Sequence, residues 1–248
     1  MAEKGNAQKE AKQIPSGIES VDVPLNGLTA HYLKAGSGAP LLLLHGGASD
    51  SRDWLETMSQ LSAKYSMYAP DIVGYGLSSG GKDVYTLNDF VEFTTAFITQ
   101  AGLEPCHLVG HSLGGRVCLE IALRYPQKVR KLVLVDSMGF GRFSKFGTFL
   151  GTAAYKIRQL LGRPQPYPVF SLEENGVKDW MCLNELPRLK VPTFLVWQQA
   201  DPYLSSSGAR QAAELIPDAR LTVIPGYGHA PHKKNPAGFS TMLSEFLG

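Results

Sequence analysis

The sequence predicts an α/β fold with a doubly wound, mostly parallel sheet of about eight strands. Two observations lead to this prediction. Short apolar runs recur at residues 40–45, 65–70, 107–110, 132–135, 193–197 and 221–224. Amphipathic stretches separate most of them, at residues 54–62, 87–101, 113–125, 208–216 and 237–247. Continuous apolar runs, in which apolar and polar residues do not alternate, are typical of strands buried on both faces. Strands that are separated by helices favour a doubly wound sheet.

The first two strands follow a different pattern. Apolar residues alternate in residues 18–24 and 28–34, and Asn26-Gly27 lies between the two runs. Asn-Gly between alternating runs is a strong hairpin signal, so the sheet should begin as an antiparallel ribbon. Residues 1–17 are polar and of mixed charge, and we expect a flexible arm there because they cannot bury apolar area. They also lack the apolar core of a signal peptide.

Composition excludes several classes of function. The 248 residues include 24 basic and 22 acidic side chains, a net charge of +2, which favours neither nucleic acid nor an anionic membrane as a partner. No apolar run approaches the ~18–20 residues of a membrane span. The three cysteines, Cys106, Cys118 and Cys182, form no CxxC pair or zinc pattern. We expect reduced thiols in a cytoplasmic protein that acts on a small molecule; oligomeric state is left open.

Residues 137–182 interrupt the alternation of strands and helices. They hold eight of the 24 aromatic residues, so we expect a short helical lid inserted into a core of residues 18–136 and 183–248. Its phenylalanines recur every third residue from Phe140 to Phe149, a spacing that wraps around a helix, and Gly141, Gly147 and Gly151 weaken a regular helix. These rings either pack the lid onto the core or form an apolar wall for a substrate.

The strongest motif is Gly110-His111-Ser112-Leu113-Gly114, which fits the G-x-S-x-G nucleophile elbow. An apolar run precedes it and a helical pattern follows it, as that turn requires. The small residues permit a tight turn that raises the Ser112 hydroxyl into a cleft. The helix N-terminus then offers free N–H groups to a developing oxyanion.

A serine nucleophile needs a base, and His229 is the best candidate. It follows the last apolar run, within Gly228-His229-Ala230-Pro231, whereas His31 and His107 lie inside expected strands and His111 should point away from the serine. His232 forms an H-x-x-H pair with His229, but no carboxylate follows at the spacing of a metal site. We therefore expect neither a metal nor a cofactor.

Asp201 is the leading candidate for the acid that orients His229. It lies just beyond the strand expected at 193–197, and it gives the chain order Ser, Asp, His. Asp136 also ends an expected strand and is the rival; its alternative role is to cap the first turn of the lid.

The second oxyanion donor should follow the run of leucines that ends at His45-Gly46-Gly47. Glycines there let a backbone N–H point into the cleft, so Gly47 and Leu113 form the expected donor pair. The loop 71–78 also follows a strand. Because its glycines lack the G-x-G-x-x-G spacing, we do not expect it to bind a dinucleotide. Further substrate contacts are expected from seven residues: His45, Gly46, His111, Phe140, Phe143, Phe146 and Trp180.

Taken in order, these motifs resemble those of the α/β-hydrolase superfamily over residues 40–236. The resemblance implies cofactor-free hydrolysis through an acyl-enzyme, most often of carboxylic esters. Members of that superfamily often carry glycine where this chain has Gln198 and glutamate where it has Lys234. Neither position belongs to the expected triad.

A serine hydrolase that cleaves esters of small, apolar or aromatic substrates is therefore our expectation. Because relatives use the same triad differently, a carbon–carbon hydrolase of ring-cleavage diketones, a cofactor-free perhydrolase and an acyltransferase stay open. A ligand receptor with very slow turnover is the alternative outside enzymes. A serine nucleophile in place of aspartate disfavours haloalkane dehalogenase and epoxide hydrolase chemistry.

Overall fold

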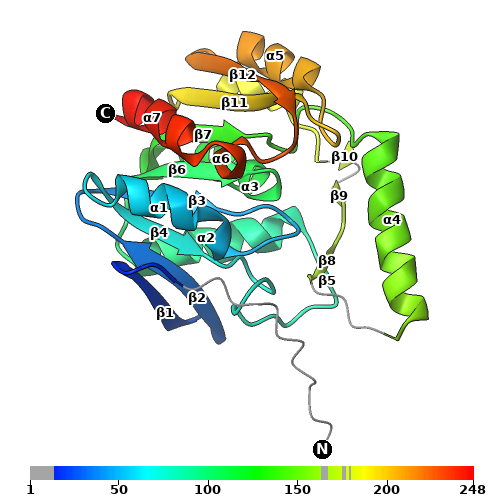
Figure 1. Ribbon diagram of the computed structural model, residues 1–248, viewed down its shortest axis with the longest axis horizontal. Helices are drawn as coiled ribbons and strands as arrows, with labels where there is room; N and C mark the ends of the chain where they lie inside the picture. The colour runs from blue at the N-terminus through cyan, green and yellow to red at the C-terminus, as the bar shows by residue number, and fades with distance from the viewer. Residues whose placement is uncertain (1–13, 163–166, 175–176, 179) are drawn as a thin grey trace, which may run out of the picture.

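The computed structural model describes residues 14–162, 167–174, 177–178 and 180–248. Eight strands form one sheet in the order β1-β2-β4-β3-β6-β7-β11-β12 (Figure 1). Their bounds are β1 (Ile18–Leu25), β2 (Leu28–Ala35), β3 (Ala39–Leu44), β4 (Tyr65–Pro70), β6 (Cys106–His111), β7 (Val129–Val135), β11 (Thr193–Ala200) and β12 (Ala219–Tyr227). Strand β2 pairs antiparallel with β1 and β4, and all other neighbours are parallel. The mostly parallel sheet expected from the sequence is confirmed.

The opening hairpin turns at Asn26 and Gly27, which have φ of 50° and 78°. Positive φ at both central residues is the requirement of a type I′ turn, for which Asn-Gly is the preferred pair. Leu25 then pairs directly with Leu28, and the register continues to Ile18 and Ala35. The dipeptide therefore sets the register of this ribbon.

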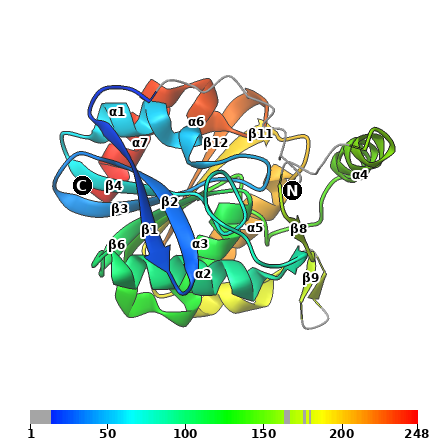
Figure 2. The ribbon, with the colours of Figure 1, turned by 90° about the horizontal axis from the view of Figure 1, so that it is seen from below.

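Helices cover both faces of the sheet. On one face lie α2 (Leu87–Gln100), α3 (Leu113–Arg124) and α5 (Ser206–Leu215), and on the other α1 (Leu55–Leu61) and α7 (Pro236–Leu247). Figure 2 shows α2 and α3 on the opposite side of the sheet from α1 and α7. Along β3, Leu42 and Leu44 pack into the first core, whereas Leu41 and Leu43 pack into the second. This double burial explains the unbroken apolar runs.

The segment between β7 and the 3-10 helix η3 (Leu183–Arg188) leaves the sheet. It contains α4 (Lys145–Leu160), which stands to one side of the sheet in both views (Figures 1 and 2). Helix α4 runs through Gly147 and Gly151, because the cost of about 1 kcal/mol per glycine does not break a helix of this length. A Cβ on Gly147 would lie 2.7 Å from the Tyr203 ring, so glycine lets α4 approach the core there.

Several short strands and helices were not predicted from the sequence. The two-residue strands β5 (Val84–Tyr85) and β8 (Val169–Phe170) pair in parallel, and β9 (Glu173–Glu174) pairs antiparallel with β10 (Val177–Lys178). The short helices η1 (Ser51–Trp54), η2 (Pro126–Lys128) and α6 (Pro231–Lys234) complete the described elements. Elements this short carry no hydrophobic period.

Most of the expected N-terminal arm, residues 1–13, lies outside the described residues. Cys106, Cys118 and Cys182 are buried free thiols. In the part of the chain that the structure describes, no helix combines the length and the apolar character needed to cross a membrane.

Candidate active site

Ser112 lies in the tight turn that joins β6 to α3. Its φ of 51° and ψ of −112° are strained values for a residue other than glycine. A Cβ on Gly114 would lie 2.5 Å from the His45 carbonyl oxygen, and one on Gly110 would overlap the Gly114 carbonyl. Glycine is therefore required on both sides of Ser112, since close packing of the turn leaves no room for a side chain.

The structure brings Ser112, His229 and Asp201 together at the carboxyl ends of the strands. The Ser112 hydroxyl donates to His229 Nε2 over 3.0 Å. His229 Nδ1–H donates to Asp201 Oδ2 over 2.6 Å, and this carboxylate side chain is 0% exposed. A carboxylate can only accept, so this bond places the imidazole proton on Nδ1 and leaves Nε2 to accept from the serine.

Asp136 and Asp201 follow the neighbouring strands β7 and β11, but the two carboxylates make different contacts. Asp201 Oδ1 accepts from the N–H groups of Tyr203 (2.7 Å) and Leu204 (3.1 Å). Asp136 Oδ1 accepts from the Gln198 N–H of β11 (2.8 Å), so Asp136 caps no turn of the expected lid. Burial raises the pKa of Asp136 to about 8, and the nearby Asp201 adds to the rise. Asp201 is thus the carboxylate that contacts His229.

The loop after β3 approaches Ser112 with its backbone. A Cβ on Gly46 would lie 3.4 Å from Ser112 Cβ, and one on Gly47 would lie 3.4 Å from Leu113 Cδ1. Leu113 is the first residue of α3, where backbone N–H groups have no partner within the helix. Both predicted oxyanion donors therefore adjoin the same space beside Ser112.

A cavity with a volume of about 590 Å³ opens at Ser112 and His229. Of the other predicted residues, Gly46, Gly47, His111, Leu113 and Phe143 line it. The remaining lining residues are Ala48, Ser49, Asp53, Met138, Gly147, Phe170, Tyr203 and Lys233. A cavity of this size fits a small organic molecule.

Three predicted substrate contacts do not line this cavity. His45 is fully buried, where its Nδ1–H donates to the Gly46 carbonyl and its Nε2 accepts from the Ile72 N–H. This burial lowers its pKa, so His45 is a neutral tether for the loop. Phe140 packs against Trp197, and Trp180 packs against Phe90. Both rings extend the hydrophobic core. The side chain of Phe146 lies outside the described residues.

Sequence reasoning missed Met138, Phe170 and Tyr203 as cavity residues. Met138 follows β7 and Tyr203 follows Asp201, so position beyond a strand end was an available signal for both. The Tyr203 ring lies 5.0 Å from the His229 ring, edge to face. Phe170 comes from β8, whose pairing with β5 has no signature in the sequence.

The two departures from the superfamily pattern hold the segment before His229. Gln198 Nε2 donates to the carbonyls of Ile224 (3.1 Å) and Pro225 (2.9 Å). Lys234 Nζ donates to the Tyr227 carbonyl over 2.5 Å. Both side chains therefore satisfy backbone carbonyls of the chain that leads from β12 to His229.

Two side-chain clusters could hold a metal ion among the described residues. One comprises His111, Asp136 and His229, and the other comprises Asp53, His111 and His232. In the first, both ring nitrogens of His229 already bond Ser112 and Asp201. Coordination by His229 would break those hydrogen bonds.

Comparison with known proteins gives consistent results. The model of the alpha/beta hydrolase fold family matches residues 39–164. The chain is 31% identical over 259 residues to the dihydrolipoyllysine-residue acetyltransferase component of the acetoin cleaving system of Cupriavidus necator, a match that covers 90% of this chain and 68% of that protein.

Two solved structures are similar to this fold throughout. Carboxylesterase CesB from Bacillus subtilis has a TM-score of 0.82 at 23% identity, over 94% of this chain and 93% of that one. A meta-cleavage product hydrolase from Pseudomonas fluorescens IP01 has a TM-score of 0.75 at 22% identity, over 92% and 97%. At these identities the similarity demonstrates a common fold.

Proposed function

Since the chain belongs to the α/β-hydrolase family, we propose that it is a serine hydrolase that cleaves carboxylic esters through an acyl-enzyme. The observation that carries this proposal is the continuous hydrogen-bonded series from Ser112 through His229 to Asp201, which opens onto a cavity. A serine hydroxyl is a weak nucleophile, and this arrangement is the one that activates it.

In the first step, Ser112 Oγ attacks the ester carbonyl carbon while His229 Nε2 takes the hydroxyl proton. Asp201 holds the imidazole with Nε2 facing the serine and stabilises the positive charge that forms on the ring. The N–H groups of Gly47 and Leu113 donate to the carbonyl oxygen as it becomes negative. Loss of one such donor costs about 2.7–4 kcal/mol in comparable sites.

Release of the alcohol and hydrolysis of the acyl-enzyme both depend on proton transfer at His229. His229 gives its proton to the leaving alkoxide, which departs as the alcohol and leaves Ser112 acylated. A water molecule then loses a proton to His229 Nε2 as its oxygen attacks the acyl carbon. The tetrahedral intermediate collapses, the acid leaves, and the proton returns to Ser112 Oγ.

The cavity walls support apolar or aromatic substrates of small size. Phe143, Phe170, Met138 and Leu113 contribute carbon surface, and the volume of about 590 Å³ limits the substrate. Phe143 comes from the segment 137–182, which we propose acts as a lid over the core of residues 18–136 and 183–248. The three buried free thiols support a reducing, cytoplasmic location.

Ser112→Ala tests the proposal directly. The substitution removes the nucleophile, so hydrolysis of p-nitrophenyl acetate should fall to background while the circular dichroism spectrum is unchanged. Ser59→Ala on α1 is the matched control, since the Ser59 hydroxyl donates to the Leu55 carbonyl of its own helix. Turnover retained by Ser112→Ala would refute the mechanism.

Carbon–carbon hydrolysis of ring-cleavage diketones is the second candidate. The similarity to the meta-cleavage product hydrolase favours it, and the same three residues could serve it. Steady-state kcat/KM for a p-nitrophenyl ester and for a vinylogous diketone separates the two functions. Preference for the diketone would replace the esterase proposal, and very slow turnover of both would favour a ligand receptor.

A further inference from the structure

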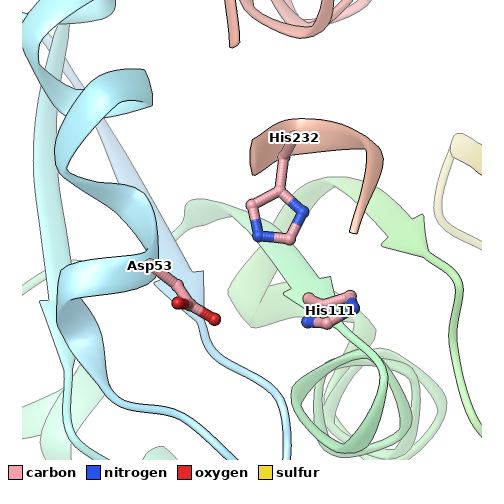
Figure 3. Close-up of side chains that lie close together, drawn as sticks. All are labelled: Asp53, His111 and His232. Carbon is pink, nitrogen blue, oxygen red and sulfur yellow. The ribbon is translucent and has the colours of Figure 1, made fainter. Parts of the chain in front are cut away.

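Asp53, His111 and His232 form a cluster beside the cavity that the hydrolytic mechanism does not use. They come from η1, the end of β6 and α6, and Figure 3 shows their side chains reaching toward one another. Their candidate ligand atoms all lie within 4.8 Å of one another. Three elements far apart in sequence thus bring two imidazoles and a carboxylate to one place.

His232 is buried without a hydrogen-bond partner for either ring nitrogen among the described residues. Only 1% of the surface of His232 is exposed. The Trp54 ring stacks on it with 4.4 Å between centroids, and the Phe239 ring lies at 5.8 Å. Buried polar atoms are nearly always paired, so a fixed imidazole with two free nitrogens requires an explanation.

His111 already has the hydrogen bond that orients a metal ligand. Its Nε2–H donates to the His229 carbonyl over 2.5 Å, which leaves the lone pair of the neutral ring on Nδ1. That Nδ1 is buried and has no partner in the described part of the chain. Histidines that bind metals typically donate their other N–H to a carbonyl or carboxylate in this way.

Asp53 completes the set with a charged oxygen. Its Oδ1 accepts from Lys233 Nζ over 2.6 Å, and its side chain is 9% exposed. A divalent cation would therefore meet nitrogens of two imidazoles and one carboxylate oxygen.

We propose that Asp53, His111 and His232 bind one divalent transition-metal ion of the zinc class. Two imidazoles and one carboxylate with an open fourth position is a donor set that zinc accepts. Ligand atoms around tetrahedral zinc are about 3.3 Å apart, so small side-chain rotations would close the cluster. Asp53 and His111 line the cavity, so the open position faces a water or an anionic oxygen of the ligand there.

The proposed ion would link the segments that carry the reaction. His111 precedes Ser112, His232 follows His229, and Asp53 lies on the chain that leaves the Gly46-Gly47 loop. A bound ion would therefore hold these segments in fixed positions relative to one another. Loss of metal binding and loss of the catalytic residues can be tested separately, because no proposed ligand is Ser112, His229 or Asp201.

The test uses the full chain after treatment with a chelator. Titration with CoCl2 should give the visible absorption of four-coordinate cobalt, and calorimetry with ZnCl2 should give one ion per chain. Asp53→Asn and His232→Gln should each weaken zinc binding by at least about 10-fold, since even loss of a supporting contact costs that much at zinc sites. ZnCl2 should raise the melting temperature of the wild type more than that of Asp53→Asn.

Two controls separate this cluster from other buried histidines and carboxylates. Asp136→Asn removes a carboxylate of the competing cluster, and His107→Gln removes a buried histidine on β6 that belongs to neither. Both variants should bind zinc as the wild type does, and so should Ser112→Ala. Absence of stoichiometric zinc binding by the wild type would overturn the proposal. Equal zinc affinity in Asp53→Asn would also overturn it. Asp53→Asn is the safer variant because its ion-pair partner, Lys233, is exposed, whereas His232 is buried.

Discussion

Asp201→Asn should abolish the basicity of His229 without removing any contact of the carboxyl group. Asp201 Oδ1 accepts two backbone N–H groups, from Tyr203 and Leu204, and Oδ2 accepts from His229 Nδ1. In the variant the amide oxygen must face the two N–H donors, because an NH2 group cannot accept from them. The NH2 group then faces His229 Nδ1.

This orientation reverses the tautomer of the imidazole. A donor opposite Nδ1 requires Nδ1 to accept, so the ring proton moves to Nε2, which lies 3.0 Å from Ser112 Oγ. Nε2 can then no longer take the serine proton. The equivalent change in a serine triad lowers kcat by about 10⁴-fold, or about 5 kcal/mol at 1.36 kcal/mol per factor of ten.

The assay is kcat for p-nitrophenyl acetate at saturating substrate, with a thermal melt to establish that the variant is folded. Asp136→Asn is the matched control, because its carboxyl bonds the Gln198 N–H and makes no hydrogen bond to His229. That variant should stay within a few-fold of the wild type. A loss below about tenfold in folded Asp201→Asn, or an equal loss in both variants, would refute the assignment of the acid.

Three further predictions follow from the packing. Burial raises the pKa of Asp136 from 3.8 to about 8, so between these values the folded chain keeps a proton that the unfolded chain releases, and stability falls as pH rises. The free energy of unfolding of Asp136→Asn should therefore rise relative to that of the wild type, by up to about 1.4 kcal/mol per pH unit between about pH 5 and pH 8. Urea denaturation of both proteins across this range measures the difference. A difference that does not change with pH would contradict the prediction. Gly114→Ala should lower the free energy of unfolding by about 1–3 kcal/mol in the same assay, because its Cβ would meet the backbone at 2.5 Å. Gly141→Ala should be close to neutral, since a Cβ there has no atom of the described residues within 4 Å. Phe143→Ala should lower kcat/KM for aromatic esters about tenfold by removing cavity wall, while Phe149→Ala, on an exposed ring, should leave the substrate profile unchanged.

Much of the candidate site is readable along the chain because its requirements are local. The turn at Ser112 needs small residues two positions away on either side: Gly110 packs against the Gly114 carbonyl of the same turn, and Gly114 packs against the His45 carbonyl. The unbroken apolar runs likewise reflect burial of each strand on both faces. Such short-range demands leave a pattern that sequence analysis can detect.

The choice between Asp136 and Asp201 depends on tertiary structure. Both follow strands of the same sheet, so the chain alone offers two acids at one edge. Strand register and the two backbone N–H groups that hold Asp201 Oδ1 direct its other oxygen to His229, while Asp136 turns to Gln198 and loses its charge through burial.

The sequence was enough to predict the sheet and the turn at Ser112, and it ranked Asp201 ahead of Asp136 as the acid. Which aromatic rings meet the cavity depends on tertiary packing, since Phe143 lines it and Phe140 packs into the core. Only the fold also brings Asp53 to His111 and His232. The physical reason is that a turn or a strand is selected by neighbouring residues, whereas cavity walls and side-chain clusters arise from packing between segments far apart in the chain.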